Sequence, residues 1–430
     1  MHFNFGLSRL FFLAIMFFAD HSNAQNVERI FNNNIRTIQL NAYGNQQGLP
    51  VYSIEEGNKI ELNFDDMDGD YKNYYYTFVL CDYNWKPVNL SAFDYIKGFT
   101  QNRINTYRYS SVAFTRYTHY QAMIPEQNSI PVKSGNYLLK VYLDGDTSKT
   151  VFTKQMLVLE TKVLIDAAVV QPFTPQFFTT HQRLKFNANI KDINSFSAAQ
   201  QVKVVILQNN RWDNSQRDIA PTFVRGNRLE YNTENTGMFA GGKEWRWLDM
   251  RSFRLLSDRV ENGIYNQGKQ EMLLKTDFNR EGERYVYFSD YNGMYNIVTY
   301  ESINPLWQAD YATIHFSFAN KNGKPFDNKD LYIIGQFTGY QINDRWKMKF
   351  SEEMGKYQCD ALLKQGYYNY AYVTVDRSNP SQLESLEGNY WETENSYTIL
   401  VYYKSFTDRN DRLIGVSSIN SRRDKPGFSF

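Results

Sequence analysis

The strongest constraint on the fold of this chain is a two-residue alternation of apolar and polar side chains in short runs that end at turn residues. In "IELNF", Ile60, Leu62 and Phe64 alternate with polar residues. Because successive side chains of a strand point to opposite faces, this period predicts strands with one buried face. Similar runs end at turns such as "SGNY" (134–137). Closely spaced strands separated by such turns are typical of antiparallel sandwiches.

Aromatic residues support the same interpretation. They make up 17% of the chain, with 33 Tyr and 31 Phe, and aromatic side chains favour pleated, half-buried surfaces. Long helical patterns are few. We therefore predict an all-β fold of tandem immunoglobulin-like or early-set β-sandwich domains, in which tyrosines cover strands whose outer faces meet water or a partner.

The order of the strand-like runs predicts three domains after a leader. Residues 25–160 are predicted to form an N-terminal β-sandwich, residues 161–304 a central β domain, and residues 305–430 a C-terminal early-set-like sandwich with a frayed tail. Within the first domain, residues 82–108 form a long connection rich in Tyr, Asn and Phe. Connections of this length are often functional.

The long connection supplies three candidate interaction residues, Trp85, Tyr95 and Phe99. Large aromatic side chains commonly anchor protein interfaces. We expect the connection to pack as a specialised loop that follows a structural strand.

Residues 1–24 are predicted to be a cleaved secretory signal. Arg9 precedes an apolar run at 10–19, and the small residues Ser22 and Ala24 stand three and one positions before the expected cleavage point. The run is shorter than the roughly 20 apolar residues that a spanning helix requires. Because no cysteine follows the cleavage point, we expect an exported protein without a direct lipid anchor.

Charge and cysteine content exclude several functions. The formal net charge is +1 at pH 7, which gives no electrostatic reason to expect nucleic acid or an anionic membrane as partner. The two cysteines, Cys81 and Cys359, fall in different predicted domains, so we expect two buried thiols. Asp82 would raise the pKa of the Cys81 thiol, which disfavours a nucleophile. We expect Cys81 to pack in the core and Asp82 to cap the following turn.

The sequence offers no recognisable catalytic or cofactor motif. The predicted mature chain contains one histidine per domain, His119, His181 and His315, and none has zinc-ligand spacing. The chain lacks a GxSxG elbow, a phosphate-binding glycine loop and HExxH. We therefore predict neither an enzyme nor a bound cofactor or metal. One further hypothesis is a hydrolase that uses a pair of carboxylates, because the distance between two such groups is set by the fold and cannot be read from the sequence.

One acidic segment resembles a calcium loop. "FDDMDGD" places Asp66, Asp68 and Asp70 at alternate positions, but the glutamate that completes an EF-hand loop is missing. We expect a solvated acidic turn after a strand, and a weak calcium site is the alternative.

The third predicted domain suggests a second class of function. "LYIIGQFTGYQINDRWKMKF" (331–350) and "GYYNYAYV" (366–373) resemble the early-set sandwiches of glycogen-binding modules and starch-active enzymes. In those modules exposed tryptophans stack on sugar rings, and Trp346 and Trp391 are the candidates here. The alternative function is therefore a glycan-binding protein of a surface nutrient-uptake system.

Several longer segments carry a more specific resemblance. They are "LCDYNW" (80–85), "YTHYQAMIP" (117–125), "FAGGKEWRWLDMRSF" (239–253) and "LEGNYWETENSYTILVYYKSF" (386–406). With these segments the chain resembles the plug protein family of the Bacteroidota type IX secretion system over nearly all of the predicted mature region. Leu80 stands where that family usually carries a histidine before the cysteine, which weighs further against a catalytic or metal role for Cys81.

The resemblance implies a periplasmic protein that is peripherally associated with the outer membrane. Its implied partner is the large translocon β-barrel of the type IX system. One copy of the protein would act as the plug in a complex with that barrel. It would close the periplasmic opening of the barrel when no shuttle protein is bound, and so prevent leakage. This role requires neither catalysis nor a cofactor.

Overall fold

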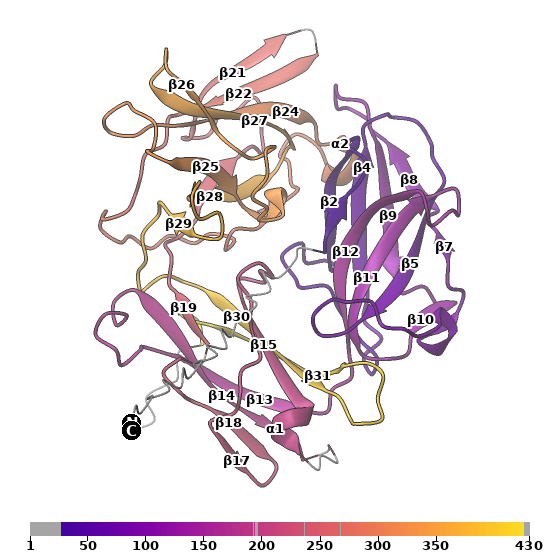
Figure 1. Cartoon of the computed structure of the whole chain (residues 1–430). Helices are drawn as coiled ribbons and strands as arrows, with labels where there is room; N and C mark the ends of the chain where they lie inside the picture. The colour runs from indigo at the N-terminus through magenta and orange to yellow at the C-terminus, as the bar shows by residue number, and fades with distance from the viewer. Residues whose placement is uncertain (1–26, 192, 194–196, 236, 267, 425–430) are drawn as a thin grey trace, which may run out of the picture.

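The computed structural model describes residues 27–191, 193, 197–235, 237–266 and 268–424. The predicted signal at 1–24 and the last six residues of the predicted frayed tail lie outside these residues. Strands are by far the main regular structure of the described chain, and its helices are few and short, so the predicted all-β sandwich class is confirmed. Its sheets form three bodies that lie against one another (Figure 1). Among the described residues no helix is both long and apolar enough to cross a membrane.

The first body is a sandwich built from the segment that follows the predicted signal. Its elements are β1 (Arg29–Ile30), β2 (Ile35–Ala42), β3 (Val51–Ser53), β4 (Ile60–Asp66), β5 (Tyr74–Cys81), the 3-10 helix η1 (Ala92–Asp94), β6 (Ile96–Gly98), β7 (Asn102–Arg103), β8 (Thr106–Tyr109), β9 (Thr118–Ile124), β10 (Ser129–Pro131), β11 (Gly135–Leu143) and β12 (Thr150–Leu159). One sheet has the order β1-β12-β11-β5-β7, with β3 on β12, and the other has the order β2-β4-β9-β8. Phe64 of β4 meets Phe152 of β12 across the core, with ring centroids 5.1 Å apart.

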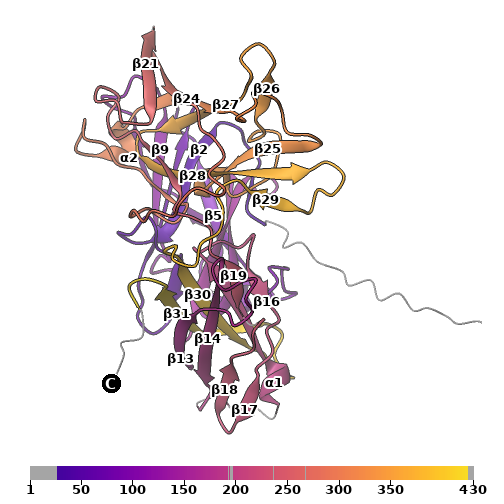
Figure 2. The ribbon, with the colours of Figure 1, turned by 90° about the vertical axis from the view of Figure 1, so that its left-hand side faces the viewer.

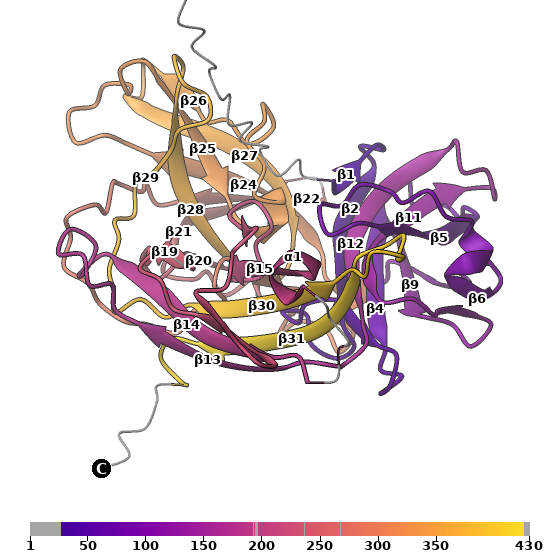
Figure 3. The ribbon, with the colours of Figure 1, turned by 60° about the horizontal axis from the view of Figure 1, so that its bottom comes forward.

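The second body combines the middle of the chain with its last two strands. Its elements are β13 (Leu164–Val170), β14 (His181–Asn189), α1 (Ala198–Gln201), β15 (Val202–Gln208), β16 (Gln216–Arg217), β17 (Phe223–Arg225), β18 (Arg228–Tyr231), β19 (Met238–Ala240), β30 (Ser396–Tyr403) and β31 (Arg412–Asn420). One sheet has the order β13-β14-β18-β17, with β19 on β14, and the other has the order β16-β15-β30-β31. Figure 3 shows β30 and β31 beside β15.

The third body lies between β19 and β30 in sequence. Its elements are β20 (Arg246–Asp249), β21 (Val260–Asn266), β22 (Lys269–Leu274), β23 (Tyr295–Asn296), α2 (Pro305–Gln308), β24 (Tyr311–Phe318), β25 (Lys329–Ile334), the 3-10 helix η2 (Gln336–Thr338), β26 (Lys349–Ser351), β27 (Lys356–Lys364), β28 (Tyr367–Asp376) and β29 (Leu383–Ser385). One sheet is centred on β28, and the other has the order β21-β22-β24-β27-β26. Phe316 and Tyr370 pack edge to face between the sheets, at 5.2 Å.

This pairing corrects the predicted division at 161–304 and 305–430. β30 pairs with β15 from Val202↔Tyr403 to Gln208↔Tyr397, so the last strands complete the second body. β20 pairs with β28, which places the segment from β20 onward in the third body. Alternation identifies a strand but not its partner, because pairing between distant segments depends on how complete faces cover one another.

Candidate functional site

The long connection at 82–108 begins with a tightly held turn. Asp82 Oδ1 accepts hydrogen bonds from the backbone N–H groups of Asn84 and Lys86, both at 2.9 Å. Trp85 has a φ of 66°, in the left-handed region that bulky residues seldom adopt. Asp82 therefore caps the turn, as expected, and the turn directs the Trp85 side chain inward, where it is 4% exposed.

The other sequence candidates differ sharply in exposure. Tyr95 is buried, and its hydroxyl donates to the Phe78 carbonyl at 3.2 Å. Phe99 is 64% exposed. Trp346 is 5% exposed and packs edge to face with Phe337. Because the Trp346 ring lies in the core, it has no free face on which a sugar could stack. Trp391 is half-buried.

Both cysteine side chains are buried, as the sequence analysis expected. Burial, reinforced by the Asp82 carboxylate, raises the pKa of Cys81 to about 12. Burial raises the pKa of Cys359 to about 11. Since the thiolate is the reactive form, neither cysteine is suited to nucleophilic chemistry near neutral pH.

Neither thiol is expected to react with Ellman's reagent in the native protein at pH 8, and two thiols per chain should react after denaturation. The physical reason is the combination of burial and raised thiol pKa. The absorbance of the thiolate released from the reagent is followed over time with and without guanidinium. It gives the number of reactive thiols per chain in the denatured and in the native protein. Rapid release of one equivalent from the native protein would contradict the packing of Cys81.

The acidic segment is organised around a lysine of the same chain segment. The carboxylates of Asp66, Asp68 and Asp70 lie close enough together to hold an ion. Lys72 Nζ lies 2.8 Å from Asp66 and 3.5 Å from Asp70, and it also pairs with Asp68. The lysine ammonium group therefore occupies the centre that a calcium ion would need. The expected solvated turn is wrong for Asp66, which is fully buried and accepts a hydrogen bond from Tyr74.

A buried polar cluster joins the first body to the third. Lys364 Nζ at the end of β27 lies 2.6 Å from Asp65 Oδ2 of β4. The same oxygen accepts a hydrogen bond from the Tyr311 hydroxyl at 2.6 Å, and His119 Nδ1 contacts the other carboxylate oxygen at 2.7 Å. Burial alone would raise the pKa of Asp65, but Lys364 and His119 outweigh it and hold that pKa below its ordinary value. The polar face of β4 is thus buried by the third body.

The first and second bodies share an apolar cluster. It contains Cys81, Tyr83, Trp85, Leu157, Val205, Leu207, Leu400, Tyr402 and Leu413. At its margin the Tyr402 hydroxyl donates to Asn136 at 2.7 Å, and Arg412 pairs with Glu160. The joint therefore resembles a domain core rather than a loose contact between domains.

The second and third bodies meet through the connection that leads into β30. Gln182 Nε2 donates to the carbonyls of Trp391 and Thr393, at 2.6 and 2.7 Å. Three buried carboxylates, Glu244, Asp290 and Glu394, lie at this joint. Burial, reinforced by the charges of Glu244 and Glu394, raises the pKa of Asp290 to about 7. Burial also raises the pKa of Glu244.

The carboxylates at this joint predict a pH effect on stability. Because the folded pKa of Asp290 is raised, its favourable contribution is present below about pH 4 and lost as pH rises toward 7. We expect Glu244→Gln to increase the free energy of unfolding at pH 8 by about 1 kcal/mol, because it removes a like charge. Urea unfolding at pH 5 and pH 8 measures this difference. Glu261→Gln, at an exposed position of β21, is the control. An equal effect of the Glu244 substitution at both pH values would contradict the argument.

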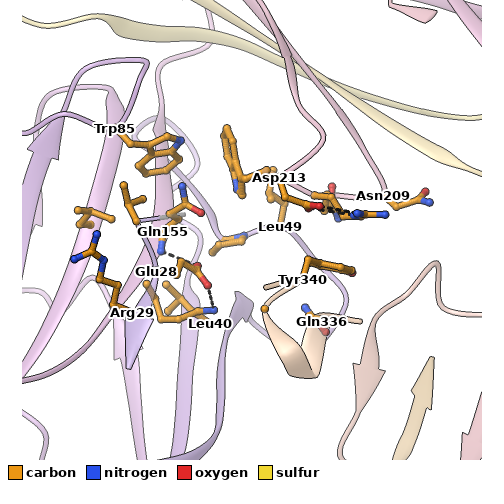
Figure 4. Close-up of a pocket in the computed structure, with 18 of the residues that line it drawn as sticks. Glu28, Arg29, Leu40, Leu49, Trp85, Gln155, Asn209, Asp213, Gln336 and Tyr340 are labelled. Carbon is orange, nitrogen blue, oxygen red and sulfur yellow. Dashed lines mark hydrogen bonds and ion pairs between the residues drawn. The ribbon is translucent and has the colours of Figure 1, made fainter. Parts of the chain in front are cut away.

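A cavity of about 850 Å³ lies where the three bodies meet. The first body contributes β1, the segment 47–50, the turn 84–87 and β12; the second contributes 209–213 and Arg217; and the third contributes Met294 and η2 with the residues after it. Figure 4 shows Trp85, Gln155 and Glu28 on one side, and Asn209, Tyr340 and Gln336 on the other. We refer to this space as the central cavity.

The walls of the central cavity are fixed by contacts between bodies. Trp85 packs edge to face with Trp212, with centroids 4.8 Å apart. The Arg211 guanidinium lies 4.6 Å from the centre of the Tyr340 ring and pairs with Asp213 at 2.6 Å. Sequence analysis identified Trp85 but missed Trp212 and Tyr340, because only the fold brings these three aromatic residues together.

Comparison with known proteins identifies a family and solved structures of similar fold. A family model described as "Type 9 secretion system plug protein 1st domain" matches residues 35–160, which span β2 to β12. The chain is similar to the crystal structure of a hypothetical protein from Parabacteroides merdae, with 30% sequence identity and a TM-score of 0.87. That match covers 91% of this chain and 98% of the other.

Two further comparisons add no argument. The Escherichia coli alpha-2-macroglobulin activated by porcine elastase aligns at 7% identity with a TM-score of 0.17, covering 90% of this chain and 34% of that one. A TM-score this low supports no common fold. The comparison with curated proteins found no match.

Proposed function

This chain belongs to the type IX secretion system plug family, and from that premise we propose that it is a periplasmic subunit that binds the large outer-membrane β-barrel translocon of the system. It seals the periplasmic opening of the barrel when no shuttle protein is bound, without chemistry of its own. Family membership itself supports a plug-type role, a protein partner at the secretion system and a location in the cell envelope.

The observation that carries the proposal is the interlocking of the three bodies. Each pair of bodies shares buried contacts: the apolar cluster around Trp85, the ion pair between Lys364 and Asp65, and the hydrogen bonds of Gln182. A seal must keep its shape, because small solutes diffuse through any gap that opens. Closely packed interiors resist such deformation, so a single interlocked body suits this role better than flexibly linked domains.

One end of the molecule carries an exposed apolar surface that suits a protein partner. Its residues, which we name the end surface, are Val112, Phe114, Leu255, Leu256, Ile264, Tyr265, Tyr300 and Ile303, each at least 41% exposed. The Phe114 and Tyr265 rings lie 5.2 Å apart and join the first body to the third. In Figure 2, β21 and α2 lie at this end, away from β17 and β18. Contiguous exposed apolar surface usually marks an interaction site.

Local contacts connect segments that carry or flank the end surface. Leu256 packs against Gly263 of β21, two residues before Tyr265. The Arg251 guanidinium lies 4.7 Å from the centre of the Tyr300 ring. The Ser111 N–H donates to the carbonyl of Trp307 in α2 at 3.0 Å. We propose that this surface faces the translocon barrel, because its aromatic and aliphatic side chains have the character of interface anchors.

Copurification tests the proposed function. The tagged full chain, purified from detergent-solubilised outer membranes, should recover a very large β-barrel protein. Cells without the plug should become permeable to small solutes in a background that also lacks the shuttle proteins. Failure to recover the barrel, or an unchanged permeability barrier in that background, would overturn the proposal.

A further inference from the structure

The central cavity has an excess of positive charge that its own residues do not neutralise. Its lining contains five basic residues, Arg29, Lys86, Lys154, Arg211 and Arg217, against two acidic residues, Glu28 and Asp213. Lys154 pairs with Glu28, and Arg211 pairs with Asp213. The other three basic residues make no ion pair with any residue that the structure describes. By contrast, the whole chain has a formal charge of only +1.

A buried hydrogen-bond donor in the cavity wall also lacks an acceptor. Trp85 is 4% exposed, and its indole Nε1 has no hydrogen-bond partner among the described residues. A buried donor without a partner destabilises the folded state, so an acceptor supplied by a ligand is favoured there. The Arg217 guanidinium carbon lies 5.7 Å from the centre of the Trp212 ring, against which Trp85 packs. The Trp85 ring and the Arg217 guanidinium group therefore both lie against the Trp212 ring.

Arg217 has hydrogen-bonding capacity to spare. It donates from Nη1 to the Tyr83 carbonyl at 2.7 Å and from Nε to Ser215 Oγ at 3.2 Å. A guanidinium group has five N–H donors in a planar arrangement that matches a carboxylate. Two of these donors hold Arg217 in place, and those that remain can bind an anionic oxygen.

The rest of the lining suits an extended peptide. The side-chain amides of Gln47 and Gln155 make no hydrogen bond with the described residues, and Gln155 is 6% exposed. Each amide offers both a donor and an acceptor, as does each peptide unit of a bound chain. Leu40, Leu49 and Leu138 add apolar surface for side chains. A simple inorganic anion would use the positive charge but neither the amides nor the leucines.

We propose that the central cavity binds an extended peptide segment that carries a carboxylate group. The carboxylate accepts hydrogen bonds from Arg217 and the Trp85 indole, Lys86 adds charge at the mouth, and the peptide backbone meets the amides of Gln47 and Gln155. The cavity lies inside the plug, so this binding site goes beyond the proposed sealing role. A plug with such a site can recognise an acidic segment of another protein independently of its contact with a barrel.

Calorimetric titration of the purified full chain tests the site with two synthetic probes. One is the acetylated, amidated hexapeptide of alternating leucine and glutamate, and the other has glutamine in place of each glutamate. The acidic peptide should bind at least about tenfold more tightly, since a hydrogen bond to a charged group contributes about 1.5–3 kcal/mol. Arg217→Gln should weaken its binding by about tenfold or more, and higher salt should weaken it further.

Three further variants keep the test independent of folding. Trp85→Phe keeps the aromatic ring and removes the N–H, so acidic-peptide binding should weaken without loss of the thermal unfolding transition. Lys86→Gln alters an exposed side chain at the mouth and should also weaken binding. Lys97→Gln alters an exposed lysine of β6 that does not line the cavity, and it should leave binding unchanged.

Three outcomes would overturn the peptide site. The first is equal affinity for the two peptides. The second is no binding of the acidic peptide up to about 1 mM, and the third is binding of anionic lipid vesicles in place of the peptide. None of these outcomes tests the proposed sealing role, because copurification with the barrel is measured separately.

Discussion

Replacing Phe114 and Tyr265 together by aspartate is expected to abolish recovery of the translocon barrel with the plug. The two rings belong to the end surface, lie 5.2 Å apart, and are 61% and 58% exposed. Removal of an aromatic anchor commonly costs 2 kcal/mol or more at an interface, so the pair should weaken binding by roughly a thousandfold. Both side chains are largely exposed, so the thermal midpoint should change little. Affinity purification with quantitative detection of the barrel measures the effect.

A matched control uses exposed aromatic residues elsewhere on the first body. Phe93 and Phe99 are 79% and 64% exposed near the two-stranded sheet of β6 and β10, and Figure 1 places β10 at the opposite end of this body from β8. Phe93→Asp with Phe99→Asp should leave barrel recovery unchanged. Loss of recovery only in this control would move the contact to the 82–108 connection and contradict the end surface.

The sequence was informative where a signal is local. Ile60, Leu62 and Phe64 alternate in the sequence, and all three are fully buried in β4. Asp82 was expected to cap its turn, because a short acidic side chain commonly bonds the backbone two residues on. Lys72 stands two residues after Asp70, so its pairing with the acidic segment had a local signal that the sequence analysis did not use.

Contacts between distant segments could not be predicted in this way. Alternation does not show what covers the polar face of β4, where Asp65 is 1% exposed because β27 brings Lys364 against it. Likewise, nothing near Trp85 or Phe99 distinguishes the buried member of the long connection from the exposed one. Burial at a joint between bodies depends on the partner face, and a single strand does not encode that face.

Lys364→Met is expected to lower the free energy of unfolding by about 3–5 kcal/mol at pH 7, because it leaves a buried carboxylate without its cation. Lys364 is 1% exposed, and its ammonium group contacts Asp65 and the Leu306 carbonyl, both at 2.6 Å. The ammonium group also lies 4.2 Å from the centre of the Tyr117 ring. Urea unfolding of the full chain measures the loss. Lys321→Met, at an exposed turn of the same body, is the control.

The pH dependence separates lost charge pairing from lost packing. In the native protein the pKa of Asp65 is held low, so its contribution to stability persists down to about pH 4 and is lost below that. Without Lys364 the buried carboxyl would favour its protonated form, and stability would fall as pH rises. The difference between the native protein and Lys364→Met should therefore be largest near pH 7 and shrink toward pH 4. A difference that is constant with pH would show a packing defect instead.

A second substitution carries this argument from stability to function. Asp65→Asn combined with Lys364→Met removes both charges, so the double variant should be more stable than Lys364→Met alone. Because the Asp65–Lys364 pair joins the first and third bodies, and Phe114 and Tyr265 come from these same two bodies, loosening this joint should separate the halves of the end surface. Barrel recovery should therefore fall in Lys364→Met and recover in part in the double variant. If a clearly destabilised Lys364→Met protein still recovered the barrel fully, binding would not require the three bodies to be held rigidly together.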